Sequence, residues 1–241
     1  MNDIDSGSLL VRQLDGVLTL TLNRPEVRNA LDLATRALLV DAVTQADAED
    51  DVRAIVITGT DPAFCGGVDL KDIARARAAG IGPGPNLGDA LRSVRTPMLA
   101  AVNGSCVTGG LEVALCCDLA VASDKAVFAD THASIGLVPG KGMWGMTAML
   151  AEAIGTQRAK DMSLTGRFVS AQEAWDMGLV SRIVPHDQLM IVVGEAAAKL
   201  AALGPGVARA WLDVYDAGAG RSLEERLAIE RAARGRLSDT V

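Results

Sequence analysis

The chain has 241 residues, of which 49% are apolar and 22% are charged, so it can build one large domain with a sizeable core. Its net charge of −7, without any dense cluster of lysine and arginine, excludes an extended surface that follows nucleic-acid phosphates. An anionic ligand would have to be held locally, by a few basic side chains and backbone N–H groups.

The sequence shows no sign of membrane insertion, secretion or metal binding. No apolar run reaches the roughly 18 residues of a membrane-spanning helix, and the first residues, MNDIDSGSLL, are acidic where a signal peptide is basic. The four cysteines lack CxxC spacing, and only His132 and His186 are present to complete a zinc site. We therefore expect a reduced cytoplasmic protein with no nucleic-acid, membrane or metal partner.

The first 60 residues predict a strand, a second strand, a helix and a third strand. Residues 8–24 contain two alternating segments joined by Asp15-Gly16, which is typical of a β-hairpin. Residues 31–50 have helical periodicity, with Asp32 as the expected N-cap. The β-branched run over residues 53–59 then predicts a buried strand.

The same alternation returns further along the chain. We predict a helix over residues 69–78, a strand over 96–104, a helix over 109–117 and a strand over 118–124. The intervening residues 80–88 contain four glycines and two prolines, which suit neither regular state. We expect this loop to be mobile without ligand and to border a ligand pocket.

Two regions are expected. Repeated strands and helices favour stacked ββα-type units over separate domains, and after Pro185 the pattern becomes purely helical. The prediction is therefore a core over residues 1–185 and a helical region over 186–241.

Two glycine-rich segments, AFCGGVDL and VTGGLEVAL, each precede a predicted helix. The first turn of a helix has N–H groups without internal partners, and glycine lets a ligand come close to them. Two such ends aimed at one point would form an oxyanion hole. Taken singly, each segment is better interpreted as an ordinary glycine-containing turn before a helix.

Glu112 and His132 are the candidate proton-transfer residues. Glu112 lies in a first helical turn, where the helix dipole alone would favour it by about 0.3–1 kcal/mol. Its neighbours are apolar, however, and burying an unpaired carboxylate costs several kcal/mol, so a functional role is the better interpretation. For His132 taken alone a structural role is the better interpretation, and His186, at a helix start, is interpreted as an exposed cap. The motif GKGMWG matches G-x-G-x-x-G, but it does not follow the first strand of a βαβ unit, so it does not predict a dinucleotide site.

Five segments together resemble the enoyl-CoA hydratase/isomerase (crotonase) superfamily. They are VLTLTLNRPEVRNAL, IVITGTDPAFCGGVDL, AVNGSCVTGGLEVALCCD, FADTHASIGLVPG and SLTGRFVSAQEAWDMGLVSRIVP, in the order and spacing of that family over most of the chain. The resemblance implies an α/β fold with a spiral core of stacked ββα turns and a C-terminal helical region. It also implies a coenzyme A thioester as ligand, no separate cofactor, and assembly as a homotrimer or a dimer of trimers.

The resemblance also implies roles for individual residues. It places the oxyanion hole on the backbone N–H groups of Val68 and Gly109, and a water-placing backbone donor at Gly140. The segments NRPEVRNAL and VDLK match the region that receives coenzyme A. The expected ligand contacts there are Arg24, Arg28 and Lys71 for the phosphates, with Asp69 and Leu70 in the same segment.

The leading functional interpretation is an enoyl-CoA hydratase for short- or medium-chain substrates. Hydratases of the family use two glutamates: Glu112 matches the first, and His132 stands where the second is expected. Because histidine exchanges protons near neutral pH, the two could share water activation and proton delivery. Another enolate reaction (isomerisation, decarboxylation or thioester hydrolysis) and a catalytically silent acyl-CoA-binding protein are the alternatives.

The end of the sequence departs from the family pattern. It stops at RLSDTV, without the final helix that many members use to complete a neighbour's acyl-CoA site. We therefore expect either a more open pocket or closure by another element.

Overall fold

The strands form two sheets in the computed structural model, which describes residues 4–82, 84–140, 143–204 and 206–237. The larger sheet begins with three antiparallel strands and continues with parallel ones. Its order is β1 (Ile4–Asp5), β2 (Leu9–Leu14), β3 (Val17–Leu22), β4 (Ala54–Gly59), β6 (Met98–Val102), β8 (Leu119–Ser123) and β11 (Arg182–Val184).

The smaller sheet consists of short strands. The strands β5, β7 and β9 are parallel neighbours, and β10 pairs antiparallel with β9 at one edge. The order is β10 (Val169–Ser170), β9 (Val127–Ala129), β7 (Ser105–Val107) and β5 (Ala63–Cys65).

Successive strands alternate between the two sheets. β4, β6 and β8 belong to the larger sheet, and each is followed along the chain by β5, β7 or β9 of the smaller one. Helices then lead from the smaller sheet back to the larger one. The result is the predicted α/β spiral of stacked ββα units.

The helices cover both sheets. Ten α-helices lie within the described residues, and three short 3-10 turns, Pro25–Val27, Ala133–Ile135 and His186–Gln188, accompany them. The α-helices are α1 (Leu33–Ala48), α2 (Leu70–Ala78), α3 (Leu87–Ser93), α4 (Gly109–Leu115), α5 (Met146–Ile154), α6 (Thr156–Thr165), α7 (Ala171–Asp176), α8 (Leu189–Ala201), α9 (Val207–Gly218) and α10 (Leu223–Leu237).

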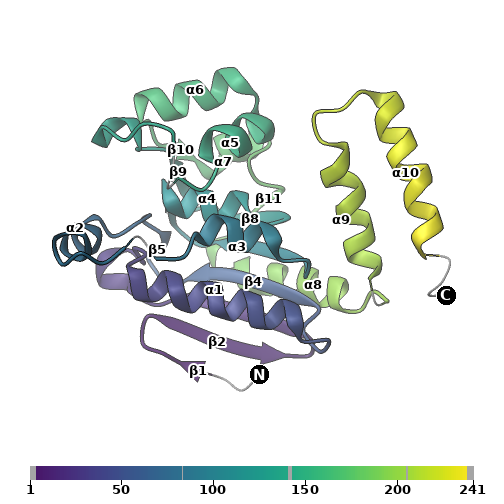
Figure 1. Ribbon diagram of the computed structural model, residues 1–241, viewed down its shortest axis with the longest axis horizontal. Helices are drawn as coiled ribbons and strands as arrows, with labels where there is room; N and C mark the ends of the chain where they lie inside the picture. Colours follow the sequence, from purple (N-terminus) through teal and green to yellow (C-terminus); the bar gives the residue numbers. More distant parts are fainter. Residues whose placement is uncertain (1–3, 83, 141–142, 205, 238–241) are drawn as a thin grey trace. The chain divides into compact units, whose positions relative to one another are not determined.

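The beginning of the chain folds as its pattern predicts. Asp15 and Gly16 both have positive φ, 50° and 81°, as the tight turn between β2 and β3 requires. The Asp32 side chain accepts a hydrogen bond from Thr35 N at 2.7 Å and so caps α1. Helix α1 then packs against β2 and β3 (Figure 1).

Strand β4 is buried along its whole length because helices lie on both faces of the larger sheet. Ile55 and Ile57 belong to the main core with α1, whereas Ala54 and Val56 face a second cluster that includes Leu189 and Val193 of α8. Helix α8 is therefore part of the sheet's packing.

The chain separates into two compact units after Ala201. The sequence placed its boundary earlier, after residue 185, because α8 has the same amphipathic pattern as the helices that follow it. The contacts of α8 with β4, β6 and β8 explain the difference. In the second unit α9 and α10 pack side by side (Figure 1). None of the helices in the described ranges combines the length and the apolar character that a membrane span needs.

The smaller sheet and the exact extent of one loop were not predicted. Strands of two or three residues are too short to show a period, so β5 was interpreted only as the approach to a glycine turn. Gly88, assigned to the irregular loop, lies in α3, where an added Cβ would stand 2.4 Å from Cβ of Trp144. The predicted loop also contains Pro83, which lies outside the described residues.

Candidate active site

The two glycine-rich segments lie against each other. They follow β5 and β7, which pair in parallel with Cys65 opposite Cys106. A Cβ on Gly110 would stand 2.2 Å from the carbonyl oxygen of Cys65, and one on Gly67, whose φ is +94°, would stand 3.0 Å from that of Val107. Glycine is required at both positions because the two backbones approach so closely.

This approach brings the backbone N–H groups of Val68 and Gly109 together. Leu31 N donates a hydrogen bond to Gly67 O, and Leu31 O accepts one from Asp69 N. Val68 lies between Gly67 and Asp69 in this parallel pairing, so its own N–H points away from Leu31. Gly109 is the first residue of α4, where the N–H has no partner within the helix. Among the described residues neither amide donates a backbone hydrogen bond. A Cβ on Gly109 would lie 3.4 Å from Val68 N, which shows how near the two donors are.

Glu112 is a buried carboxylate held in place by backbone amides. Only 2% of its surface is exposed, and its Oε1 accepts hydrogen bonds from Trp144 N at 2.8 Å and Met146 N at 3.1 Å. Burial raises the pKa of Glu112, although these hydrogen bonds and nearby His132 act in the opposite direction. The residue is therefore more than a favourable charge in a first helical turn.

Helix α3 supports the segment that holds Glu112. Gly88 packs directly beneath Trp144, and Arg92 donates a hydrogen bond to the Trp144 carbonyl oxygen. The orientation of the Trp144 amide toward Glu112 thus depends on a helix that does not itself carry a site residue.

His132 lies between two carboxylates. Its Nδ1 is 2.8 Å from Oδ1 of Asp130, and its Nε2 is 4.0 Å from Oε2 of Glu112. Burial acts to raise the pKa of Asp130, but hydrogen bonds from His132 and Ser163 outweigh it and the pKa is lowered. An ionised Asp130 accepts a hydrogen bond from the Nδ1–H of His132. In the neutral ring, Nε2 is then the nitrogen that carries the lone pair, and it faces Glu112.

Four of the site residues, Val68, Leu70, Glu112 and His132, line a cavity of about 490 Å³. Apolar side chains from α2, from residues 135–138 and from residues 143–144 line it as well, whereas Gly109 and Asp130 do not. Ile81 and Gly82 also line the cavity, which confirms that the glycine- and proline-rich loop borders the pocket. Its mobility stays a prediction.

Two of the residues expected to contact coenzyme A are engaged within the protein. Arg24 donates to Ala30 O at 2.6 Å and forms ion pairs with Asp69 at 3.1 Å and Asp32 at 3.3 Å. Asp69 also caps α2 by accepting from Lys71 N. Hydrogen bonds from Asp72 N and Arg24 lower its pKa against the opposing effect of burial. Both side chains therefore join the starts of α1 and α2.

The remaining predicted residues lie at the surface or away from the cavity. Arg28 and Lys71 are exposed, and Gly140 is exposed and does not line the cavity. His186 is not a freely exposed cap, because its ring hydrogen-bonds Ser123 Oγ and Asp61 Oδ2, both at 3.0 Å.

Sequence reasoning missed two buried charged residues of the site, Asp130 and Arg36. Asp130 stands two residues before His132, a spacing that could have drawn attention to a carboxylate–imidazole pair. Arg36 lies on the same helical face as the buried Leu39 and Val43, and a charge within such an apolar stripe is the signal that was available.

Known proteins match this chain over nearly its whole length. The family model described as enoyl-CoA hydratase/isomerase matches residues 12–240. A probable enoyl-CoA hydratase of Mycobacterium bovis is 36% identical over 226 residues, which cover 93% of this chain and 87% of that protein.

Solved structures agree with this match. An enoyl-CoA hydratase subunit from Geobacillus kaustophilus superposes with a TM-score of 0.86 at 35% identity, covering 97% of this chain and 90% of the other. An enoyl-CoA hydratase from Mycobacterium smegmatis is 40% identical with a TM-score of 0.77, covering 98% and 100%. The chain therefore belongs to the enoyl-CoA hydratase/isomerase family.

Proposed function

We propose that the protein is an enoyl-CoA hydratase, which adds water across the double bond of a short- or medium-chain 2-enoyl-CoA. The observation that carries this proposal is the 4.0 Å separation of Glu112 Oε2 and His132 Nε2 across the cavity wall. The two atoms are too far apart to bond each other, yet one water oxygen can lie at about 2.8 Å from both. Two proton-exchanging groups around one water suit hydration.

The N–H groups of Val68 and Gly109 form the proposed oxyanion hole. When water adds to C3, negative charge develops on the thioester oxygen, and fixed donors stabilise it without reorganising. In a complex with an acyl-CoA analogue, we expect both nitrogens to lie roughly 2.7–3.1 Å from that oxygen. A crystal structure of the complex measures both distances, and a thioester oxygen that reaches neither amide contradicts the mechanism.

Glu112 and His132 have separate roles in this mechanism. Glu112, as a carboxylate, removes a proton from water while the water oxygen bonds to C3. His132 accepts a hydrogen bond from that water through Nε2 and so completes its placement. The proton held by Glu112 then passes to C2 as the enolate collapses, which returns Glu112 to the carboxylate. Asp130 keeps the imidazole in the tautomer that presents Nε2 to the cavity. The exposed side chains of Arg28 and Lys71 are the proposed contacts for coenzyme A phosphates.

Turnover of crotonyl-CoA tests the function. Hydration removes the conjugated double bond, so absorbance of the enoyl thioester should fall, and 3-hydroxybutyryl-CoA should form with oxygen from labelled water. Binding without turnover would favour a silent acyl-CoA-binding protein. Release of free coenzyme A, loss of carbon dioxide or migration of the double bond would each replace hydration by the corresponding enolate reaction.

The proposed assembly is a homotrimer or a dimer of trimers formed through the C-terminal helices. Trp211 and Tyr215 of α9 are exposed and have ring centroids 6.5 Å apart, and Leu223 of α10 is exposed as well. Large apolar side chains that gather on a surface are typical of a subunit interface. We expect sedimentation velocity at micromolar concentration to give a trimer or hexamer, and a monomer would contradict the assembly.

A further inference from the structure

Arg36 is a buried cation with two guanidinium nitrogens that are unpaired within the part of the chain that the structure describes. It lies on the core face of α1, and only 5% of its surface is exposed. Its Nε and Nη2 atoms have no hydrogen-bond partner among the described residues. Because arginine stays charged in proteins, a buried guanidinium without a counter-ion is strongly unfavourable. Such a group calls for an anion, which the described residues do not supply.

The two carboxylates that favour the charge of Arg36 are engaged elsewhere. Asp32 pairs with Arg24 at 3.3 Å, and Asp72 accepts a hydrogen bond from Leu33 N at 2.9 Å. Burial is the larger influence on Arg36 and lowers its pKa, so the nearby acids do not make up for the loss of water. The cation is left available to a ligand.

Arg36 lines the same cavity as Glu112 and His132. It stands about one helical turn after Asp32, and Leu31, at the start of that turn, pairs with Val68 of the proposed oxyanion hole. The start of α1, the helix that carries Arg36, therefore lies beside the proposed oxyanion hole.

We propose that Arg36 binds a carboxylate carried by the acyl group, so that the preferred substrates are coenzyme A monothioesters of dicarboxylic acids. This proposal rests on the acyl-CoA site proposed above. The phosphates of coenzyme A are the other anions at hand, but the whole pantetheine arm separates them from the thioester. The phosphates are better suited to an exposed cation such as Arg77, which also lines the cavity, than to the buried guanidinium of Arg36.

Calorimetric binding of three ligands tests the proposal without relying on turnover. The ligands are glutaryl-CoA, valeryl-CoA, which has the same number of acyl carbons but no carboxylate, and coenzyme A itself. Wild type should bind glutaryl-CoA roughly 10- to 100-fold more tightly than valeryl-CoA, as expected for one charge-assisted hydrogen-bonded pair. Arg36→Met should lose this preference while keeping its affinity for valeryl-CoA. Arg77→Met, the matched loss of a cation from the same cavity, should keep the preference.

The other outcomes are equally decisive. Equal affinities of wild type for glutaryl-CoA and valeryl-CoA would overturn the carboxylate assignment. An equal loss of affinity by Arg36→Met for all three ligands would overturn it as well, because it would indicate that Arg36 binds a coenzyme A phosphate. Failure of wild type to bind valeryl-CoA and glutaryl-CoA would instead remove the acyl-CoA site itself. Arg36→Met should fold at least as stably as wild type, because it replaces an unpaired buried charge by an apolar side chain. Arg36→Lys, which keeps the charge, should retain part of the preference and serves if Arg36→Met does not fold.

Discussion

Glu112→Gln is expected to reduce crotonyl-CoA turnover by about 10²–10⁴-fold or more, because a general base of this kind contributes that much. Glutamine can still accept the Trp144 and Met146 hydrogen bonds through its Oε1, so the shape of the site is kept while the base is lost. Affinity for a saturated acyl-CoA should be almost unchanged. Steady-state kinetics and calorimetry together measure this separation of kcat from binding.

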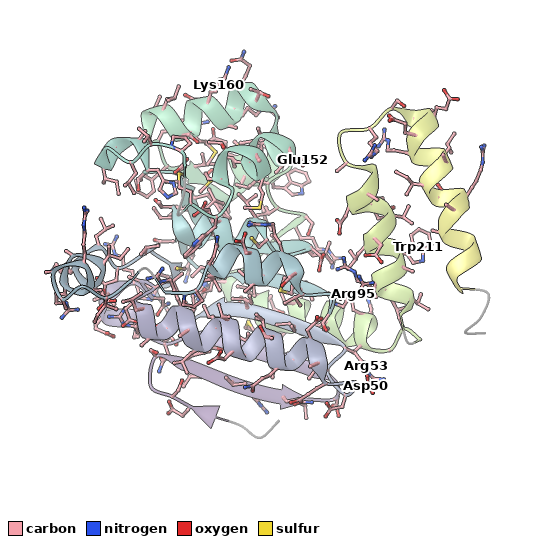
Figure 2. All side chains as sticks on the ribbon, viewed as in Figure 1. Asp50, Arg53, Arg95, Glu152, Lys160 and Trp211 are labelled. Atoms are coloured by element: carbon pink, nitrogen blue, oxygen red, sulfur yellow. The ribbon has the colours of Figure 1, made fainter. Side chains whose placement is uncertain are left out.

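Glu152→Gln is the matched control for this change. Glu152 is an exposed glutamate on α5 (Figure 2), so the same chemical substitution there should leave turnover at the wild-type level. If Glu112→Gln also kept wild-type turnover, the assignment of the base would be wrong.

Glu112→Gln is also expected to change the stability of the protein. Because burial raises the pKa of Glu112 in the folded protein, folding favours its protonated form. That contribution is complete below the pKa of an unfolded glutamate and is lost as pH rises through the raised folded value. Above that folded value the ionised Glu112 therefore destabilises the fold, and Glu112→Gln should raise the midpoint of thermal unfolding there. The advantage should shrink at acidic pH.

His132→Ala is expected to cause a loss of comparable size, about 10²–10⁴-fold, and to remove any pH dependence of turnover near neutrality. The imidazole is the group of the site that ordinarily changes its charge in that range. A pH–rate profile from pH 5 to 9 measures both effects. His186→Ala is the control. It removes a ring that hydrogen-bonds Asp61 and Ser123, and it should keep the wild-type profile.

Asp130→Asn separates the positioning of the imidazole from its presence. An amide can donate to Nδ1 as well as accept from it, so it no longer fixes the tautomer that presents the Nε2 lone pair to the cavity, and turnover should fall. Because the pKa of Asp130 is lowered in the fold, its carboxylate contributes stability above the unfolded pKa and loses it as pH falls through the folded value. Wild-type turnover by Asp130→Asn would show that the carboxylate does not position the imidazole.

His132→Glu reports what the histidine is for. It restores the two-glutamate arrangement of the family's hydratases in the same cavity. If it raises crotonyl-CoA hydration well above wild type, the native site is tuned for another enolate reaction. If it lowers hydration, the Glu112–His132 pair is itself the hydration machinery.

Local signals predicted a large part of the fold. The Asp15-Gly16 turn, the Asp32 cap and the β-branched run of β4 each depend on a few neighbouring residues, and all three are confirmed. The smaller sheet could not be predicted in the same way, because its strands are stabilised by pairing between distant turns of the spiral. Helix α8 was assigned to the wrong region for a similar reason, since its partners are strands far away in sequence.

The site was predictable where one residue was anomalous in its own surroundings. Glu112 stood out as an acid in an apolar run, and the paired glycines stood out as close approaches. Asp130 did not stand out, because an acid two residues before a histidine is a weak signal until the fold shows the 2.8 Å contact between them. For Arg24 the sequence suggested a phosphate contact, whereas its guanidinium joins Asp69 and Asp32 across two helix starts. Only the folded contacts distinguish a free cation from an engaged one.

The parallel strands β5, β7 and β9 end side by side, and each leads directly into a different part of the proposed site. β5 leads to the Val68 amide, β7 to the Gly109 amide and Glu112, and β9 to Asp130 and His132. The two donors that would hold the thioester therefore come from two repeats of the spiral, and the acid–base pair is divided between the second of these repeats and a third. A change in the loop after β9 can alter the proton transfers without moving the ends of the other two strands. Substitutions in this one loop can therefore give the same fold a new reaction on the same class of thioester.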